Sequence, residues 1–279
     1  MGATDRALLE LASTVALEAA ELVREGRRGA VTVTATKSSP DDVVTEVDRA
    51  VEELIRARVL EARPEDGFLG EEGAARDSAS GVTWVVDPID GTVNFLYGIP
   101  QYAVSIAASR GGEVVAGVVV DVASGEEFRA VRGDGATCGD RPLRVREPVP
   151  LERRLVATGF NYVPETRAIQ AAAVARMLGT VRDVRRMGSA ALDLCALAAG
   201  RLDAYVEEGL HPWDLAAGGL IATEAGARVT SVPGAGGRDC VVAAPEQGFD
   251  DFLALVGRCG FLADGGPLPP AGGPRPERE

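Results

Sequence analysis

The stretch WVVDPIDGTVNF, residues 84–95, joins a strand to a pair of aspartates and decides how the rest of the chain is interpreted. Residues 82–86 have the β-branched and aromatic character of a buried strand, and Asp87 follows them directly. Because Pro88 cannot donate a ladder hydrogen bond, we expect the chain to turn there and to bring Asp87 and Asp90 to one point. Carboxylates at the end of a buried strand are costly to desolvate unless positive charge meets them. The stretch therefore predicts a site for a divalent cation and a phosphate group.

The residues after Asp90 suit phosphate binding. Gly91 leaves room for close approach of the backbone, and Thr92 adds a hydroxyl at the same place. A helix that begins near Val93 would direct its free N–H groups toward a phosphate oxygen. The simpler alternative is an Asp-Pro turn in which an aspartate and the threonine only cap this helix.

Length and composition indicate an ordinary globular protein whose partner is a small molecule rather than nucleic acid. The chain has 279 residues, of which 46% are hydrophobic and 25% charged, and this suits one large domain or two modest ones. Its net charge of −13 argues against nucleic acid or an anionic membrane surface as the main partner. No uncharged apolar run reaches the length of a membrane span, and acidic residues interrupt the N-terminal segment. The four cysteines are widely spaced and indicate reduced, mostly buried thiols, so we expect a cytoplasmic protein.

The hydrophobic pattern predicts two domains and a tail. Two amphipathic helices and five strands come first, and glycine turns join the last three strands into an antiparallel meander. From about residue 150 strands and helices alternate, which is typical of an α/β domain. We therefore expect an N-terminal α+β domain, residues 1–147, that carries most metal ligands, and a C-terminal α/β domain, residues 148–262, that completes the site. Residues 263–279 are rich in Pro and Gly and are expected to be a disordered tail.

The predicted elements have the following bounds. Helices are expected at 4–25, from 45 onward, and at 165–178, 189–199 and 212–225. Strands are expected at 68–70, 82–86, 102–108, 114–120, 126–131, 154–158, 181–185, 203–207 and 227–231.

Candidate catalytic groups are carboxylates rather than histidines. His211 is the only histidine, so a serine triad or a histidine-rich zinc site would depend on that one residue. Acidic residues instead lie at the ends of predicted elements, where hard cations with oxygen ligands could use them. Taken singly, Asp48, Glu71, Glu207 and Asp214 each have an ordinary alternative as a cap or a solvated loop residue.

Lys37 is unusual because the other 28 of the 29 basic residues are arginines. A codon bias that spared one lysine by chance is one explanation. The other is that this position requires a compact ammonium, which a guanidinium cannot replace. Lys37 precedes the segment that contains Asp48, so we predict a catalytic role for it beside the metal site.

The sequence resembles the inositol monophosphatase family of magnesium-dependent, lithium-sensitive phosphatases over nearly its whole length, roughly residues 5–257. The first signature is WVVDPIDGTVNF, and the second is WDLAAGGLIATEAGA at 213–227. Further motifs occur in the same order as in the family: DDVVTEVD (41–48), GEE (70–72), GSAALDL (188–194) and YVEEGLHPWD (205–214).

The resemblance implies a layered αβαβα sandwich, a homodimer and two or three Mg²⁺ ions. It assigns the metal ligands to Glu71, Asp87, Asp90 and Asp214, joined by the carbonyl of Ile89. It also implies that Glu71 and Thr92 position the attacking water, and that Asp48 accepts a hydrogen bond from the Thr92 hydroxyl. The remaining implied contacts are with the substrate. The resemblance implies that the amides of Gly91 and Thr92 hold the phosphate, and that Asp90 and Asp214 also face the substrate. It implies that the alcohol, inositol, lies beside Gly188, Ser189, Ala190 and Glu207.

The identity of the phosphate ester is less constrained than the chemistry. Inositol monophosphatases usually have Thr where this chain has Val93, and relatives that act on adenosine bisphosphate tend to have Lys-Glu after the threonine, which this chain lacks. Myo-inositol monophosphate is the predicted substrate. Histidinol phosphate, fructose bisphosphate and a regulatory binding role for the same fold remain as alternatives.

Two competing phosphatase motifs fit less well. Residues 138–144 have the C-x5-R spacing of a cysteine phosphatase, but Asp140 would repel phosphate and Pro142 lacks an N–H, so we predict a hairpin loop there. In the haloacid-dehalogenase loop the aspartates are two residues apart, whereas here they are three apart. We therefore expect no aspartyl-phosphate intermediate.

Overall fold

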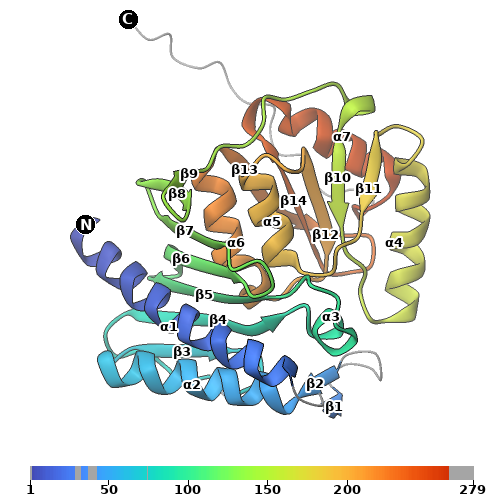
Figure 1. Cartoon of the computed structure of the whole chain (residues 1–279). Coiled ribbons are helices and arrows are strands. Elements are labelled where there is room, and N and C mark those ends of the chain that lie inside the picture. Colours follow the sequence, from blue (N-terminus) through green and yellow to red (C-terminus); the bar gives the residue numbers. More distant parts are fainter. Residues whose placement is uncertain (1, 29–32, 37–42, 74, 264–279) are drawn as a thin grey trace, which may run out of the picture.

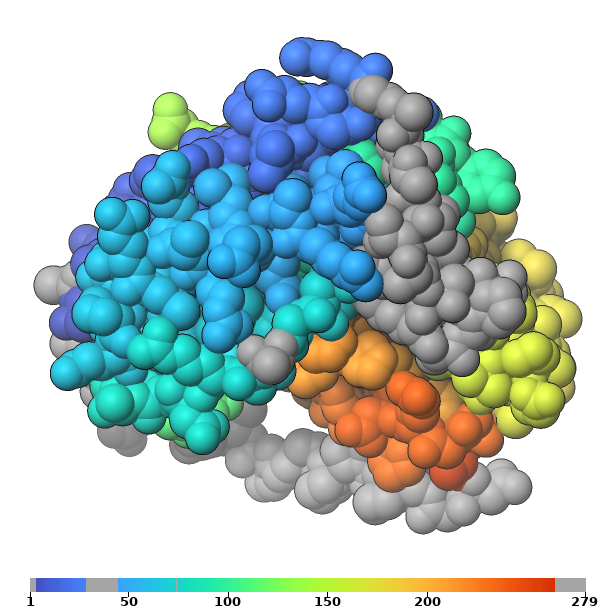
Figure 2. Space-filling model, turned by 90° about the horizontal axis from the view of Figure 1, so that it is seen from below, coloured from blue at the N-terminus to red at the C-terminus, as the bar shows by residue number. Residues whose placement is uncertain are grey.

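Helices and sheets alternate in five layers in the computed structural model, which describes residues 2–28, 33–36, 43–73 and 75–263 (Figure 1). The helices are α1 (Gly2–Arg28), α2 (Glu46–Ala62), α3 (Thr92–Tyr97), α4 (Pro164–Met177), α5 (Ala190–Ala198), α6 (Pro212–Glu224) and α7 (Phe249–Cys259). Helices α1 and α2 lie side by side and cover the outer face of a seven-stranded sheet (Figure 2). Helices α5 and α6 lie between that sheet and a five-stranded sheet, whose outer face α4 and α7 cover. The predicted α/β class and the predicted αβαβα sandwich are confirmed.

The seven-stranded sheet follows the order of the sequence. Its strands are β3 (Gly67–Gly70), β4 (Val82–Asp90), β5 (Ala103–Arg110), β6 (Glu113–Asp121), β7 (Glu127–Val131), β8 (Gly135–Cys138) and β9 (Arg141–Pro142). Strand β3 pairs with β4 in parallel, and every later neighbour pairs in the antiparallel sense. The predicted antiparallel meander is β5–β7, and the C-x5-R segment forms the predicted hairpin between β8 and β9.

The five-stranded sheet has a crossed order, β11-β10-β12-β14-β13. Its strands are β10 (Leu155–Thr158), β11 (Asp183–Arg185), β12 (Ala204–Glu208), β13 (Ala227–Pro233) and β14 (Asp239–Pro245). The first three pair in parallel, and β14 then pairs antiparallel with both β12 and β13. Strand β14 and helix α7 are not among the elements predicted from the sequence. Two short strands near the N-terminus, β1 (Val33–Thr36) and β2 (Val43–Thr45), form a separate antiparallel pair.

Strand β4 does not end where the sequence predicted. The ladder with β5 runs from Val82 to Asp87, which pairs with Ser105, and it resumes at Asp90, which pairs with Ala103. Pro88 and Ile89 thus lie opposite a single residue, so the strand bulges instead of turning away. Pro88 does interrupt the ladder, as expected, but the interruption is local. The bulge allows the two aspartates to serve one site although both belong to one strand.

The amphipathic pattern of α1 explains how the outer layer packs. Leu8, Ala12, Val15, Ala19 and Val23 follow one another at intervals of three or four residues, and all are buried against the first sheet.

The four cysteines are free thiols, and all but the half-buried Cys138 are buried. Within the described residues, no helix is both long enough and apolar enough to cross a membrane.

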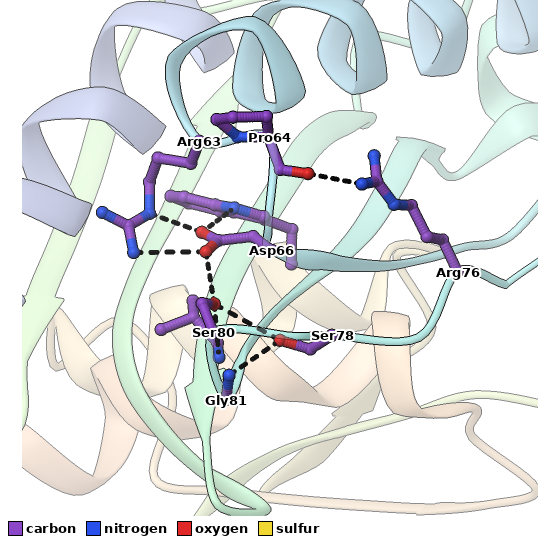
Figure 3. Close-up of polar contacts among 9 residues, drawn as sticks. Arg63, Pro64, Asp66, Arg76, Ser78, Ser80 and Gly81 are labelled. Atoms are coloured by element: carbon purple, nitrogen blue, oxygen red, sulfur yellow. Dashed lines mark hydrogen bonds and ion pairs between the residues drawn. The ribbon is translucent and has the colours of Figure 1, made fainter.

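A buried carboxylate fixes the start of β3 to the start of β4. Asp66 is only 1% exposed and accepts hydrogen bonds from the Trp84 indole (Nε1–Oδ2, 3.0 Å) and from the Ser80 hydroxyl (Oγ–Oδ1, 2.6 Å). Arg63, which follows α2, forms an ion pair with it, and Figure 3 shows the arginine and the serine on two sides of the carboxylate. Because both oxygens of the buried Asp66 carboxylate have partners, these contacts stabilise the two strands near whose other ends the acidic residues lie.

Candidate active site

One cavity brings the predicted site residues together. It has a volume of about 390 Å³ and is lined by residues from both sheets. The predicted residues that line it are Glu71, Asp87, Ile89, Asp90, Gly91, Thr92, Gly188, Ser189, Ala190, Glu207 and Asp214. Asp48 lies behind Thr92, and Lys37 lies outside the described residues, so its predicted role stays a prediction.

Parallel pairing of β3 with β4 positions the first two carboxylates. Gly70, the last residue of β3, pairs with Val86, so Glu71 directly after β3 comes beside Asp87 in β4. The two carboxyl groups are close enough to share a hydrogen bond. The amide of Ile89 donates to Asp87 Oδ1 (3.0 Å), which holds this carboxylate within the bulge.

Gly91 and Asn94 connect the two halves of the site. Gly91 has φ of 97°, and a Cβ there would lie 2.8 Å from the carbonyl oxygen of Gln101, so only glycine fits. The side-chain amide of Asn94 donates to the carbonyls of Gln101 and Met187, both at 2.8 Å. These bonds fix α3, which begins at Thr92, to the segment that precedes Gly188.

Asp48 orients the Thr92 hydroxyl, as the resemblance implied. The Thr92 Oγ1 lies 3.1 Å from Asp48 Oδ1 and 3.0 Å from the carbonyl oxygen of Ile89. The other carboxylate oxygen of Asp48 accepts from the backbone amide of Thr45 (2.9 Å) and from its hydroxyl, so Asp48 also completes a capping box on α2. The ordinary role as a cap and the catalytic role are therefore compatible.

Asp90 and Asp214 are each held by the start of a helix. Asp90 Oδ2 accepts hydrogen bonds from the Ser189 hydroxyl (2.6 Å) and from the Ala191 amide (2.7 Å) at the start of α5. Ser189 thus directs its hydroxyl at a carboxylate, although the residue lies on the cavity wall. Asp214 Oδ2 accepts from the backbone amide of His211 (2.7 Å) at the start of α6.

Burial and mutual repulsion act together on these carboxyl groups. Burial raises the pKa of Asp87 well above its usual range, and three neighbouring carboxylates raise it further. Burial raises the pKa of Asp90 to about 6 against the hydrogen bonds from Ser189 and Ala191. Burial and then the charge of Asp90 raise the pKa of Asp214 well above its usual range. The cluster would therefore be stabilised by any cation that enters it.

The donor set fits a hard divalent cation. The four predicted carboxylate ligands, Glu71, Asp87, Asp90 and Asp214, line the cavity together with Ile89, and carboxylate and carbonyl oxygens are the ligands that Mg²⁺ prefers. Among the described residues, no three His, Cys, Asp or Glu side chains are already arranged as a complete ligand group. The fit thus depends on the type and charge of the ligands, and a bound cation would have to draw the carboxylates together.

The opposite wall of the cavity carries a second acidic group and its partners. Glu207 accepts a hydrogen bond from the Tyr205 hydroxyl (2.7 Å). Burial raises the pKa of Glu207 to about 7, against that hydrogen bond and the positive charge of Arg186. Asp193, on α5 nearby, is 1% exposed, and its Oδ1 has no hydrogen-bond partner among the described residues. This wall offers both donors and acceptors to a hydroxylated ligand.

Several cavity residues were not predicted from the sequence. Arg186 and Arg238 bring positive charge to a site expected to be acidic, and the segment around Asn161 supplies part of the second wall. His211 also lines the cavity, where its ring stacks on Trp213 with centroids 4.9 Å apart. Only His211 and Trp213 could have been found from the sequence, because both lie within the motif YVEEGLHPWD that ends at Asp214.

Comparison with known proteins agrees with this geometry. The model of the inositol monophosphatase family matches residues 5–256, which is most of the chain. The chain belongs to the inositol monophosphatase family. The predicted family and the predicted class of enzyme, a phosphoric monoester hydrolase, are thereby confirmed.

Individual relatives align with this chain over most of their own length. The chain is 49% identical to the inositol-1-monophosphatase SuhB of Mycobacterium tuberculosis, over 90% of this chain and 93% of that protein. The crystal structure of the extragenic suppressor protein suhB of Bartonella henselae has a TM-score of 0.83 at 35% identity and covers 90% of this chain and 98% of its own. The Nus factor SuhB of Pasteurella multocida is 40% identical over 81% of this chain and 86% of its own length.

Proposed function

We propose that this chain hydrolyses myo-inositol monophosphate to inositol and phosphate in a reaction that requires Mg²⁺. The observation that carries the proposal is the single cavity in which four carboxylates meet the Thr92–Asp48 pair. The similarity to proteins named inositol-1-monophosphatase supports the choice of ester.

We assign the cation ligands to Glu71, Asp87, Asp90, Asp214 and the carbonyl of Ile89, and we propose two or three Mg²⁺ ions. Bound Mg²⁺ would lower the pKa of a water molecule and stabilise negative charge on the leaving oxygen, so neither a histidine base nor a covalent intermediate is needed. The mutual repulsion of these carboxylates supports the assignment, because a bound divalent cation would relieve it.

Thr92 and Glu71 are proposed to hold the attacking water. A hydroxyl has one hydrogen, so a Thr92 that donates to Asp48 keeps its oxygen lone pairs for a water in the cavity. The Asp48 carboxylate fixes that orientation, since Thr45 holds its other oxygen. Glu71 can accept the second hydrogen of the same water. The amides of Gly91 and Thr92 are proposed to hold phosphate oxygens.

The wall around Glu207 is proposed to hold the polyol. Glu207 and Arg186 offer an acceptor and a donor to hydroxyl groups, and Gly188, Ser189 and Ala190 line the same cavity. Arg238 adds a second positive charge to the cavity, which a second phosphate group could use, so fructose bisphosphate is one ester to be compared. Histidinol phosphate is the other.

Relative activities on a panel of esters test the substrate. We expect the highest kcat/KM on a myo-inositol monophosphate, inhibition by lithium, and a loss of several orders of magnitude in kcat for Asp87→Asn. Higher kcat/KM on fructose bisphosphate or histidinol phosphate would replace the substrate and keep the chemistry. An Asp87→Asn variant within about threefold of the wild type, under ~1 kcal/mol in activation free energy, would reduce Asp87 to a structural residue.

Two further features of the protein are proposed from the same resemblance. A homodimer is supported by large apolar side chains at the surface around the end of α3, where Tyr97, its last residue, is 76% exposed and Ile99 is 49% exposed. Sedimentation of the purified chain tests this, and a monomer at micromolar concentration would contradict it. We also propose that the protein is cytoplasmic, with a domain boundary near residue 147.

A regulatory role is the second candidate, because one relative at 40% identity is named a Nus factor. The net charge of −13 disfavours direct contact with RNA, so such a role would use a protein partner. An Asp87→Asn variant that keeps full function in the cell would favour it.

A further inference from the structure

Glu52, on the inner face of α2, is a buried acid that the proposed chemistry does not use. It is 5% exposed and lies against residues 70–73, the last residue of β3 and the start of the loop that follows. Its Oε2 accepts a hydrogen bond from the backbone amide of Glu72 (2.8 Å), and the carboxylate accepts a second from the amide of Gly73. These two amides come directly after Glu71.

The glycines on either side of the two glutamates are explained by Glu52. A Cβ at position 70 would lie 2.4 Å from the Glu52 carboxyl carbon, and a Cβ at position 73 would lie 2.6 Å from its Oε1. Carbon atoms do not approach so closely, so any side chain at either position would displace the carboxylate. The segment Gly-Glu-Glu-Gly thus has the small residues that let a carboxylate reach its backbone.

The electrostatic cost of burying the Glu52 carboxylate indicates that this side chain does more than fill space. Burial raises its pKa, the charges of Glu72 and Glu71 raise it further, and the two backbone amides oppose these effects. An apolar side chain of similar size would fill the space without this cost. A buried acid beside two other acids is useful when its hydrogen bonds hold a backbone in one conformation.

We propose that Glu52 is a positioning residue, which fixes the loop of residues 70–73 through its two amides and so directs the Glu71 carboxylate toward Asp87 and the cation site. The inference rests on the proposed function, since it gives Glu71 a role as a cation ligand. The amides of Glu72 and Gly73 follow Glu71 in the chain. If they lost their hydrogen bonds to Glu52, the backbone on the C-terminal side of Glu71 would be free to move. Groups that orient metal ligands typically contribute ten- to a hundredfold to metal affinity.

The test compares Glu52→Asp, Glu52→Gln and, as a control, Ile55→Val. Aspartate keeps the charge but is one methylene too short to reach the loop, whereas glutamine keeps the length, loses the charge and presents an N–H to one of the two amides. Ile55 is fully buried on the same helix, so its truncation perturbs packing without touching the loop. Each purified protein is freed of metal with a chelator, and Mg²⁺ binding is measured by calorimetry. Hydrogen exchange is followed at the amides of residues 72 and 73.

Glu52→Asp is expected to weaken Mg²⁺ binding at least about tenfold and to speed exchange at both amides, while KM for the ester stays within about twofold. Ile55→Val should match the wild type in Mg²⁺ binding and in exchange at these amides. Wild-type affinity in Glu52→Asp would overturn the inference, as would a loss confined to Glu52→Gln, because charge and not position would then matter. If the wild type itself bound no Mg²⁺, the proposed function would fail, and exchange at residues 72 and 73 would still decide whether Glu52 holds the loop.

Discussion

Replacing Asp90 by asparagine is expected to stabilise the metal-free protein while it abolishes activity. Asp90 is 8% exposed, and its Oδ2 is held by Ser189 and Ala191. An asparagine oxygen can keep both hydrogen bonds, and the asparagine amide can then donate toward Glu71 or Asp214 in place of a repelling charge. The substitution thus removes an unfavourable buried charge without removing its partners.

The size of the effect follows from the pKa of Asp90. Burial raises this pKa from 3.8 to about 6, and the difference corresponds to about 3 kcal/mol of stability at 1.36 kcal/mol per pKa unit. Because the folded-state pKa is the higher one, the folded protein retains a proton that the unfolded chain releases. Stability is therefore full below about pH 4, falls as the pH rises to about 6, and stays low above that. At pH 8 the wild type carries the whole cost, and at pH 4.5 it carries only about 1 kcal/mol.

Urea denaturation in excess chelator measures this directly. Asp90→Asn should exceed the wild type in unfolding free energy by about 3 kcal/mol at pH 8 and by about 1 kcal/mol at pH 4.5. Mg²⁺ at a thousand times its Kd should reverse the order at pH 8, since it stabilises the wild type by about 4.1 kcal/mol, which exceeds the difference of about 3 kcal/mol, while the variant lacks one ligand and gains less. A metal-free variant that is less stable than the wild type at pH 8, or equally improved at both pH values, would refute the reasoning.

Three other substitutions give separate tests. Ser189→Ala removes the hydroxyl that directs Asp90 and caps α5, so we expect at least about tenfold lower kcat and ~1 kcal/mol lower stability, and an unchanged kcat would contradict it. Trp84→Phe removes the indole donor to Asp66 and should lower the unfolding free energy in urea by about 1.5–3 kcal/mol with kcat almost unchanged; full stability would show that this hydrogen bond contributes nothing. Lys37→Arg should lower kcat by about tenfold or more with the Tm nearly constant, whereas wild-type kcat would make Lys37 an ordinary surface residue.

Local sequence patterns predicted most of the first sheet but not the order of the second. The meander β5–β7 was predicted because its partners are adjacent in sequence and joined by glycine turns. Strand β14 inserts between β12 and β13, and no pattern within the run Cys240–Ala244, buried throughout, indicates which strands will flank it. The bulge at Pro88 was missed because the proline interrupts only one step of the ladder.

The acidic half of the site was predictable, and the residues that position it were not. Asp87, Ile89 and Asp90 lie within a signature motif, whereas Glu71 directly follows β3 and Asp214 lies in the first turn of α6. Glu52 is different, because on the sequence it is one of several acids on an amphipathic helix, and only the fold shows that it faces inward. Arg186 and Arg238 lie on exposed loops, where neither periodicity nor spacing distinguishes them from other arginines.

The most direct test of the central claim is the rate of phosphate release from a myo-inositol monophosphate as a function of Mg²⁺ concentration. The buried, mutually repelling carboxylates around Asp87 predict no release above background in excess chelator. They also predict a saturable recovery when Mg²⁺ is added back to the same sample. A rate that is undiminished in excess chelator would contradict the claim that these carboxylates act by holding a divalent cation.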